Sequence, residues 1–249
     1  MRAIATFSLI GALALSTGQV SAQTSTGPAT PAATARPPVG QGENGDWAFI
    51  GRYREANQPL LAAADPKRVV FMGDSITQGW AEQPFVKGNA HFVGRGISGQ
   101  TTPQMLVRFR SDVVALKPAV VHIMGGTNDV AQNTGPTTPE ETEGYITGMV
   151  EIARANGIKV VLASIPPALD FPWRKDLSPG PKIKALNAWL KDYAARKHLV
   201  YVDYWPAIAT PEGGMKPGYS HDGVHPNAEA FAAMAPLAQA AIDKAIRGK

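Results

Sequence analysis

The most constraining feature of this sequence is a series of short apolar, β-prone runs separated by longer amphipathic segments. Runs without a polar residue at every second position are typical of strands buried on both faces of a parallel sheet. The runs are residues 69–72, 91–93, 120–124, 159–163 and 199–202. The intervening helices are expected over 102–116, 140–156, 181–197 and 228–246. Repeated strand-helix units predict an α/β fold, a three-layer α/β/α sandwich with a five-stranded parallel sheet.

Glycine-rich and polar turns follow three of these runs, at residues 73–75, 96–102 and 125–129, and a fourth polar stretch lies at 222–227. Each turn has a plain structural interpretation, because Gly, Asp, Ser and Asn favour turns and helix caps. Ligands of open parallel sheets, however, bind beyond the carboxyl ends of the strands. The shared position of the first three turns therefore predicts that they converge on one functional edge.

The four stretches, Gly-Asp-Ser, Gly-Ile-Ser-Gly-Gln-Thr-Thr, Gly-Gly-Thr-Asn-Asp and Asp-Gly-Val-His-Pro-Asn, resemble the SGNH (GDSL-like) hydrolase superfamily of esterases and acylhydrolases. The resemblance covers about residues 69–227 and implies a flavodoxin-like fold. It also implies ester hydrolysis through an acyl-enzyme, with no metal and no other cofactor. By the same resemblance Ser75 is the nucleophile, His225 its base and Asp222 the partner of that histidine.

The chemistry of the three residue types supports these roles. A serine hydroxyl is a weak nucleophile until a neighbouring base accepts its proton, and imidazole titrates near neutrality. Asp222 precedes His225 by three residues, and Gly223 between them favours a turn that brings the carboxylate to the ring. The structural alternative for His225 is a capping residue before Pro226.

The resemblance assigns the oxyanion hole to the backbone N–H groups of Ser75 and Gly99 and to the side-chain amide of Asn128. Glycine lets a substrate approach the backbone closely, and an asparagine amide donates without titrating. The alternatives are that Gly99 is a loop glycine and that Asn128 is a turn or cap residue. The Gly-x-Ser-x-Gly elbow of α/β-hydrolases is absent around Ser75.

The sequence departs from the family pattern at two positions, one a conservative apolar exchange and the other a change that affects only local loop geometry. Ile76 stands where the name-giving motif has leucine, and Gly94 stands where many relatives carry asparagine. Other titratable residues are assigned to structure: His91, His122, His198, Asp74 and Asp129. His221 neighbours Asp222, but its offset fits the pattern less well than that of His225.

Residues 1–22 have the features of a signal peptide, since Arg2 precedes an apolar stretch and small residues end at Ala22, after which we expect cleavage. Residues 23–45 are rich in Thr, Pro, Ala and Gly and predict a flexible linker before a hydrolase domain at 46–249. The structural alternative for residues 1–22 is a buried N-terminal helix. The mature protein is expected to be secreted or periplasmic, with no later segment of the roughly 20 apolar residues that span a bilayer.

Charge and cysteine content exclude several classes of function. The net charge is +4, but the basic residues are scattered among acids, so no nucleic-acid-binding surface is expected. The sequence has no cysteine, which excludes disulfides, thiolate zinc sites and cysteine nucleophiles.

The predicted substrate is a small-molecule or carbohydrate ester. Export and the linker favour an extracellular or periplasmic target such as carbohydrate acetyl esters, and no broad apolar segment indicates the lid of a long-chain lipase. Phe171 and Trp173 follow the fourth strand and are candidates to line the substrate rim by stacking on a sugar. The alternative is that these aromatic side chains only pack a proline-rich loop against the rest of the domain. Alternative functions are a lysophospholipase or thioesterase, an acyltransferase with the same triad, and a non-catalytic carbohydrate-binding protein.

Overall fold

A computed structural model describes residues 45–248 of the chain. The predicted signal peptide and all but the last residue of the predicted linker lie outside the described residues. Five strands form one sheet in the order β2-β1-β3-β4-β5, and every neighbouring pair is parallel. The strands are β1 (Val69–Gly73), β2 (Phe92–Gly96), β3 (Val120–Met124), β4 (Lys159–Ala163) and β5 (Val200–Val202). The predicted α/β/α sandwich is confirmed.

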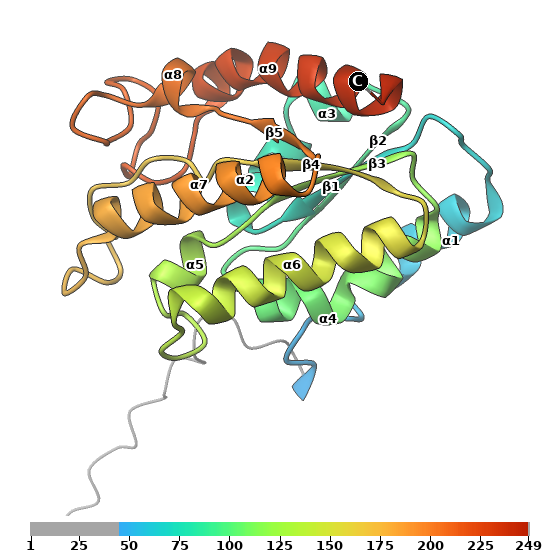
Figure 1. The fold of residues 1–249 in the computed structure, drawn as a ribbon, viewed down its shortest axis with the longest axis horizontal. Coiled ribbons are helices and arrows are strands. Elements are labelled where there is room, and N and C mark those ends of the chain that lie inside the picture. The colour runs from blue at the N-terminus through green and yellow to red at the C-terminus, as the bar shows by residue number, and fades with distance from the viewer. Residues whose placement is uncertain (1–44, 249) are drawn as a thin grey trace, which may run out of the picture. The chain divides into compact units, whose positions relative to one another are not determined.

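Helices cover both faces of the sheet (Figure 1). One face carries α2 (Ser75–Ala81), α3 (Pro84–Lys87), α8 (Trp205–Ile208) and α9 (Ala228–Arg247). The other carries α1 (Arg54–Ala62), α4 (Thr102–Asp112), α5 (Thr127–Val130), α6 (Pro139–Ala155) and α7 (Pro179–Arg196), together with a 3-10 turn η2 (Val114–Leu116). Across residues 45–248, no helix combines the length and the apolar character needed to cross a membrane.

Each face of the sheet has its own apolar core, because successive strand side chains point to opposite sides. In β1, Val70 and Met72 pack toward α4, α6 and α7, whereas Val69 and Phe71 pack toward α2 and α9. Trp80 of α2 is fully buried in the second cluster. Because helices cover both faces of the sheet, a functional site is expected at the edge formed by the ends of the strands.

The long predicted helices are confirmed, and the short ones were not foreseen. Helices α6, α7 and α9 begin and end within two residues of the predicted bounds. The helix predicted over 102–116 instead ends at Asp112, where η2 replaces its last turn. Helices α3, α5 and α8 have only 4 residues each, which is too short for an apolar periodicity to appear in the sequence.

Candidate active site

Ser75 is the first residue of α2, and a single residue, Asp74, separates it from the carboxyl end of β1. Asp74 caps the helix, since its Oδ1 accepts a hydrogen bond of 3.0 Å from the backbone N–H of Ile76. Gly73 leaves no room for a side chain, because a Cβ there would lie 2.0 Å from Thr77 Oγ1 and 2.5 Å from the carbonyl oxygen of Met124. The tight junction of strand and helix therefore holds the Ser75 hydroxyl at the rim of the sheet.

His225 approaches Ser75 from a loop 150 positions later in the chain. The distance from Ser75 Oγ to His225 Nε2 is 2.9 Å, and His225 Nδ1 lies 2.6 Å from Asp222 Oδ2. A bridge between Ser220 and Pro226 closes the loop, and Gly223 adopts a φ of +78° at its tip. The three side chains that the family resemblance selects are thus brought into one hydrogen-bonded chain.

The Asp222 carboxylate is held in its ionised form. Partial burial acts to raise its pKa, but hydrogen bonds from the backbone N–H and ring of His225 and from the N–H of Val224 outweigh burial and lower the pKa to about 2. An ionised carboxylate only accepts hydrogen bonds, so it fixes the proton of the imidazole on Nδ1. Nε2 is then free to accept a proton from Ser75.

The predicted oxyanion donors lie on adjoining segments. Gly99 has a φ of +76°, a left-handed conformation that favours glycine, in the turn between β2 and α4. Asn128 is buried in α5, and its Nδ2 donates a 3.0 Å hydrogen bond to the carbonyl of Gln100, next to Gly99. An amide nitrogen carries two hydrogens, so this bond leaves the second hydrogen of Asn128 available to another acceptor.

Asn133 is a contact residue of this site that the sequence analysis missed. Its Nδ2 donates to Asn128 Oδ1 over 2.7 Å and to the Gly99 carbonyl over 3.3 Å. Its Oδ1 accepts a 3.2 Å hydrogen bond from Trp173 Nε1. One side chain thus links both predicted oxyanion segments to the aromatic rim. No motif marks Asn133 in the sequence, since it lies in an irregular turn after α5.

Replacing Asn133 by Asp is expected to lower kcat by about tenfold or more with little change in KM, because small misplacements of a stabilising group are costly. Aspartate keeps an acceptor for Trp173 but loses the donor that orients the Asn128 amide. Steady-state kinetics on p-nitrophenyl acetate measure the effect, and Asn133→Ala provides the comparison that loses both contacts. A wild-type kcat in Asn133→Asp would exclude this positioning role.

The two aromatic candidates differ in exposure. Trp173 is 37% exposed, and its ring centroid lies 6.2 Å from that of His225. Phe171 is 0% exposed and stacks on Trp173 with centroids 5.1 Å apart. The prediction that Phe171 contacts substrate is therefore wrong, because its ring is enclosed in the core beneath the tryptophan. Of these two aromatic residues, Trp173 is the one with an accessible ring.

Three of the titratable residues that the sequence analysis assigned to structure, His91, His122 and Asp129, have side-chain partners outside the Ser75 hydrogen-bond chain. Buried His122 lies with Nε2 2.8 Å from the Tyr204 hydroxyl, and His91 Nδ1 lies 3.1 Å from Asp65 Oδ2, within hydrogen-bond distance. The carboxylate of Asp129 accepts hydrogen bonds from the backbone N–H and hydroxyl of Thr102 at the start of α4. None of these residues belongs to the Ser75 hydrogen-bond chain.

Two buried acids lie beneath the site with raised pKa values. Burial is the main cause for both Asp74 and Asp129, and it raises each pKa to about 6 from an ordinary value of 3.8. The folded protein therefore holds these protons more tightly than the unfolded chain between about pH 4 and pH 6. Their contribution to stability is fully present below pH 4 and is lost as the pH rises through 6.

Replacing Asp129 by Asn is expected to remove that pH dependence. Between pH 4 and pH 7 the free energy of unfolding of the variant should rise relative to wild type by about 2 kcal/mol, since one pKa unit corresponds to about 1.4 kcal/mol. Urea denaturation at intervals of pH measures the difference. If the free energy of unfolding depended on pH in the same way for both proteins across this range, Asp129 would not titrate as inferred.

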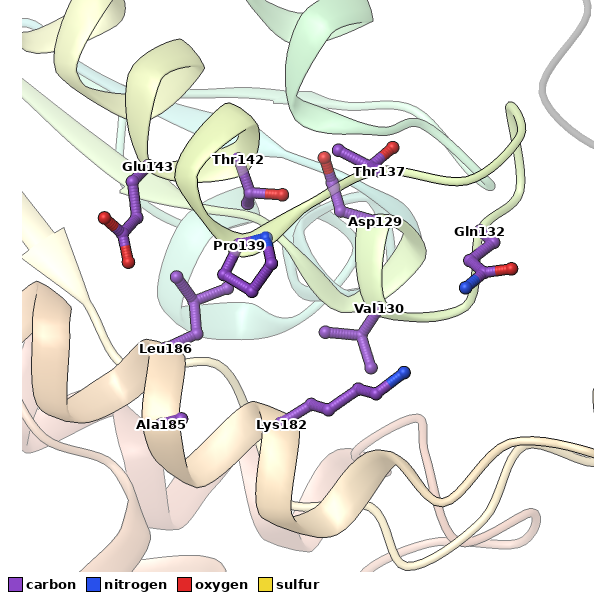
Figure 2. A pocket seen from close by; sticks show the side chains of 10 residues that line it. All are labelled: Asp129, Val130, Gln132, Thr137, Pro139, Thr142, Glu143, Lys182, Ala185 and Leu186. Atoms are coloured by element: carbon purple, nitrogen blue, oxygen red, sulfur yellow. The ribbon is translucent and has the colours of Figure 1, made fainter.

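A separate cavity of about 200 Å³ lies between α5, α6 and α7 and is mostly apolar (Figure 2). Lys182 of α7 extends along its edge and Glu143 of α6 lies at the opposite end. The triad residues do not line it. Within residues 45–248, no cluster of three or more His, Asp or Glu side chains has the arrangement of a metal site.

Residues 71–233 match the sequence profile of the GDSL-like Lipase/Acylhydrolase family. A GDSL-like lipase from Bacteroides thetaiotaomicron VPI-5482 is 46% identical, with a TM-score of 0.74 over 80% of this chain and 98% of that one. The uncharacterized lipoprotein YqeF of Bacillus subtilis is 26% identical over 59% of this chain and 74% of its own. Axe2, an acetylxylan esterase from Geobacillus stearothermophilus, shares the fold at 20% identity and a TM-score of 0.57, over 71% of this chain and 94% of that one.

Proposed function

The chain belongs to the GDSL-like lipase/acylhydrolase family, a family of carboxylic ester hydrolases, and from that premise we propose that it is an exported serine esterase acting through Ser75, His225 and Asp222. The observation that carries the proposal is the continuous hydrogen-bond chain from the Ser75 hydroxyl through the imidazole to the Asp222 carboxylate, with distances of 2.9 and 2.6 Å. This arrangement suits a base-activated nucleophile.

The reaction proceeds in two halves. Ser75 Oγ attacks the ester carbonyl carbon while His225 Nε2 takes the hydroxyl proton, and the ionised Asp222 stabilises the imidazolium. The tetrahedral intermediate collapses with cleavage of the carbon–oxygen bond to the alcohol, which leaves with the proton from His225. Water, deprotonated by the same imidazole, then attacks the acyl-enzyme and releases the acid and free Ser75.

Negative charge on the carbonyl oxygen needs fixed donors in both halves. The N–H of the first residue of a helix has no partner inside the helix, which leaves the Ser75 N–H available. The Gly99 N–H and the second hydrogen of the Asn128 amide complete the proposed set. Fixed donors of this kind each lower the barrier by about 3 to 4 kcal/mol.

We infer that the preferred substrate carries a short acyl group, such as acetyl, on a carbohydrate. The His225 and Asp222 side chains are 39% and 38% exposed, which suits a bulky, solvated alcohol. Exposed Trp173 beside His225 offers a face on which a sugar ring can stack. The predicted signal peptide and the description of YqeF as a lipoprotein support an extracytoplasmic location.

Hydrolysis of p-nitrophenyl acetate, butyrate and octanoate tests the acyl preference. We expect kcat/KM to fall as the acyl chain lengthens, and acetate to be released from acetylated xylan, pectin or chitin oligomers. A preference for octanoate, for a lysophospholipid or for an acyl thioester would favour the alternative hydrolases. Transfer of acetyl to an added sugar in preference to water would favour an acyltransferase.

A further inference from the structure

A hollow of about 590 Å³ adjoins the turn that carries Gly99. Its lining residues are Asp46, Phe49, Gly51, Arg52, Arg54, Gln78, Ile97 and Ser98. Gln78 lies one helical turn after Ser75, and side chains at this spacing lie about 5 to 6 Å apart at Cβ. The Ser98 N–H, next to Gly99, donates a 2.8 Å hydrogen bond to Gln78 Oε1. The hollow therefore begins beside the proposed nucleophile and oxyanion donor.

The outer wall of the hollow, residues 46–54, is tied to this turn by hydrogen bonds. The Ala48 carbonyl accepts from Gln100 Nε2 over 3.0 Å, and the Tyr53 hydroxyl donates to the Gly96 carbonyl. The Asp46 carboxylate accepts hydrogen bonds of 2.9 and 2.8 Å from two backbone N–H groups, those of residues 50 and 51. The wall is thus held in place over the turn.

The charge of the hollow is positive. Arg52 and Arg54 are exposed, and in the described part of the chain neither forms an ion pair. Asp46 is the one acid among the lining residues, and its oxygens are engaged by the backbone. Guanidinium groups bind carboxylates and phosphates with paired, charge-assisted hydrogen bonds.

We propose that this hollow is a subsite for an anionic group on the alcohol portion of the ester, with Arg52 and Arg54 as its ligands. The inference rests on the proposed function, in which a small acetyl group occupies the reacting centre and the alcohol must extend along the rim. The chemistry is that of a carboxylate or a phosphate: an acidic saccharide supplies the first and a glycerophosphate the second.

The test compares matched acetyl esters with wild type and the double variant Arg52→Gln/Arg54→Gln. One pair is an acetylated galacturonide oligomer and the same oligomer with its carboxyl groups converted to neutral methyl esters. The second pair is acetylated glycerol 3-phosphate and acetylated glycerol, and release of acetate is measured throughout. We expect the variant to lose about tenfold in kcat/KM on at least one anionic ester, mainly through KM, because charge-assisted hydrogen bonds are lost. The loss should shrink as salt is added. The responding pair identifies the anion.

Neutral esters and p-nitrophenyl acetate should be hydrolysed equally by wild type and the variant, and Arg110→Gln/Arg247→Gln is the control for removal of two exposed charges. Equal losses on neutral and anionic esters, or no loss on either anionic ester, would overturn the subsite. Isothermal titration calorimetry can measure the binding of unacetylated galacturonide and of glycerol 3-phosphate to the Ser75→Ala variant. Because this measurement needs no catalysis, it tests the subsite separately from the proposed reaction. Binding of neither would also overturn the subsite, even in an active enzyme.

Discussion

Replacing Ser75 by Ala is expected to lower kcat on p-nitrophenyl acetate by about 10⁴-fold or more, since removal of a triad nucleophile leaves only the oxyanion donors and substrate binding. Ser75 is the first residue of α2, and alanine is compatible with a helix, so the fold should be retained. Stopped assays with purified protein measure the residual rate. Far-UV circular dichroism and the melting temperature check that the variant is folded.

A double variant tests whether Ser75 and His225 act together in one mechanism. Residues that act as a unit are strongly non-additive, so Ser75→Ala/His225→Ala should be about as inactive as either single variant. His221→Ala is the matched histidine control, because His221 lies in the same loop outside the hydrogen-bond chain and should keep wild-type activity. Wild-type turnover by folded Ser75→Ala, or multiplied losses in the double variant, would contradict a shared triad.

Replacing Asp222 by Asn is expected to lower kcat by about 10³- to 10⁴-fold. The loop should survive, because one amide oxygen can still accept from the backbone N–H groups of Val224 and His225, which lie 2.9 and 2.8 Å from Asp222 Oδ1. The amide nitrogen, however, then faces His225 Nδ1 and donates to it. The imidazole proton is driven to Nε2, so the ring no longer accepts from Ser75.

Asp222→Ala separates this tautomer effect from loop support. It removes the loop hydrogen bonds as well, so it should lower the melting temperature more than Asp222→Asn while also abolishing most activity. A kcat of Asp222→Asn within tenfold of wild type would mean that the carboxylate does not orient His225.

The sheet could be predicted from the sequence because buried parallel strands leave continuous apolar runs, as in Val69 to Met72. The position of Ser75 followed from the same reasoning, since a turn after such a strand lies at the rim of the sheet. The partnership of Asp222 with His225 was also accessible, because a separation of three residues needs only a local turn.

Other parts of the site left no signal in the sequence. Asn133 acts through contacts with residues brought close by tertiary folding, and its own turn is irregular. Phe171 and Trp173 have similar sequence surroundings, and only packing shows that one ring is enclosed and the other exposed. The segment before α1 reaches the Gly99 turn partly through a backbone carbonyl, that of Ala48, which any residue supplies.

The most direct test of the triad is to identify the residue that a serine-reactive p-nitrophenyl phosphonate modifies. Trypsin cleavage after Arg68 and Lys87 isolates Ser75 in a peptide whose one other hydroxyl residue is Thr77. We expect one phosphonyl group per chain, located on Ser75 by tandem mass spectrometry, with loss of esterase activity in proportion to labelling. Full inactivation with the label on another residue, or persistent activity after stoichiometric labelling of Ser75, would contradict Ser75 as the nucleophile.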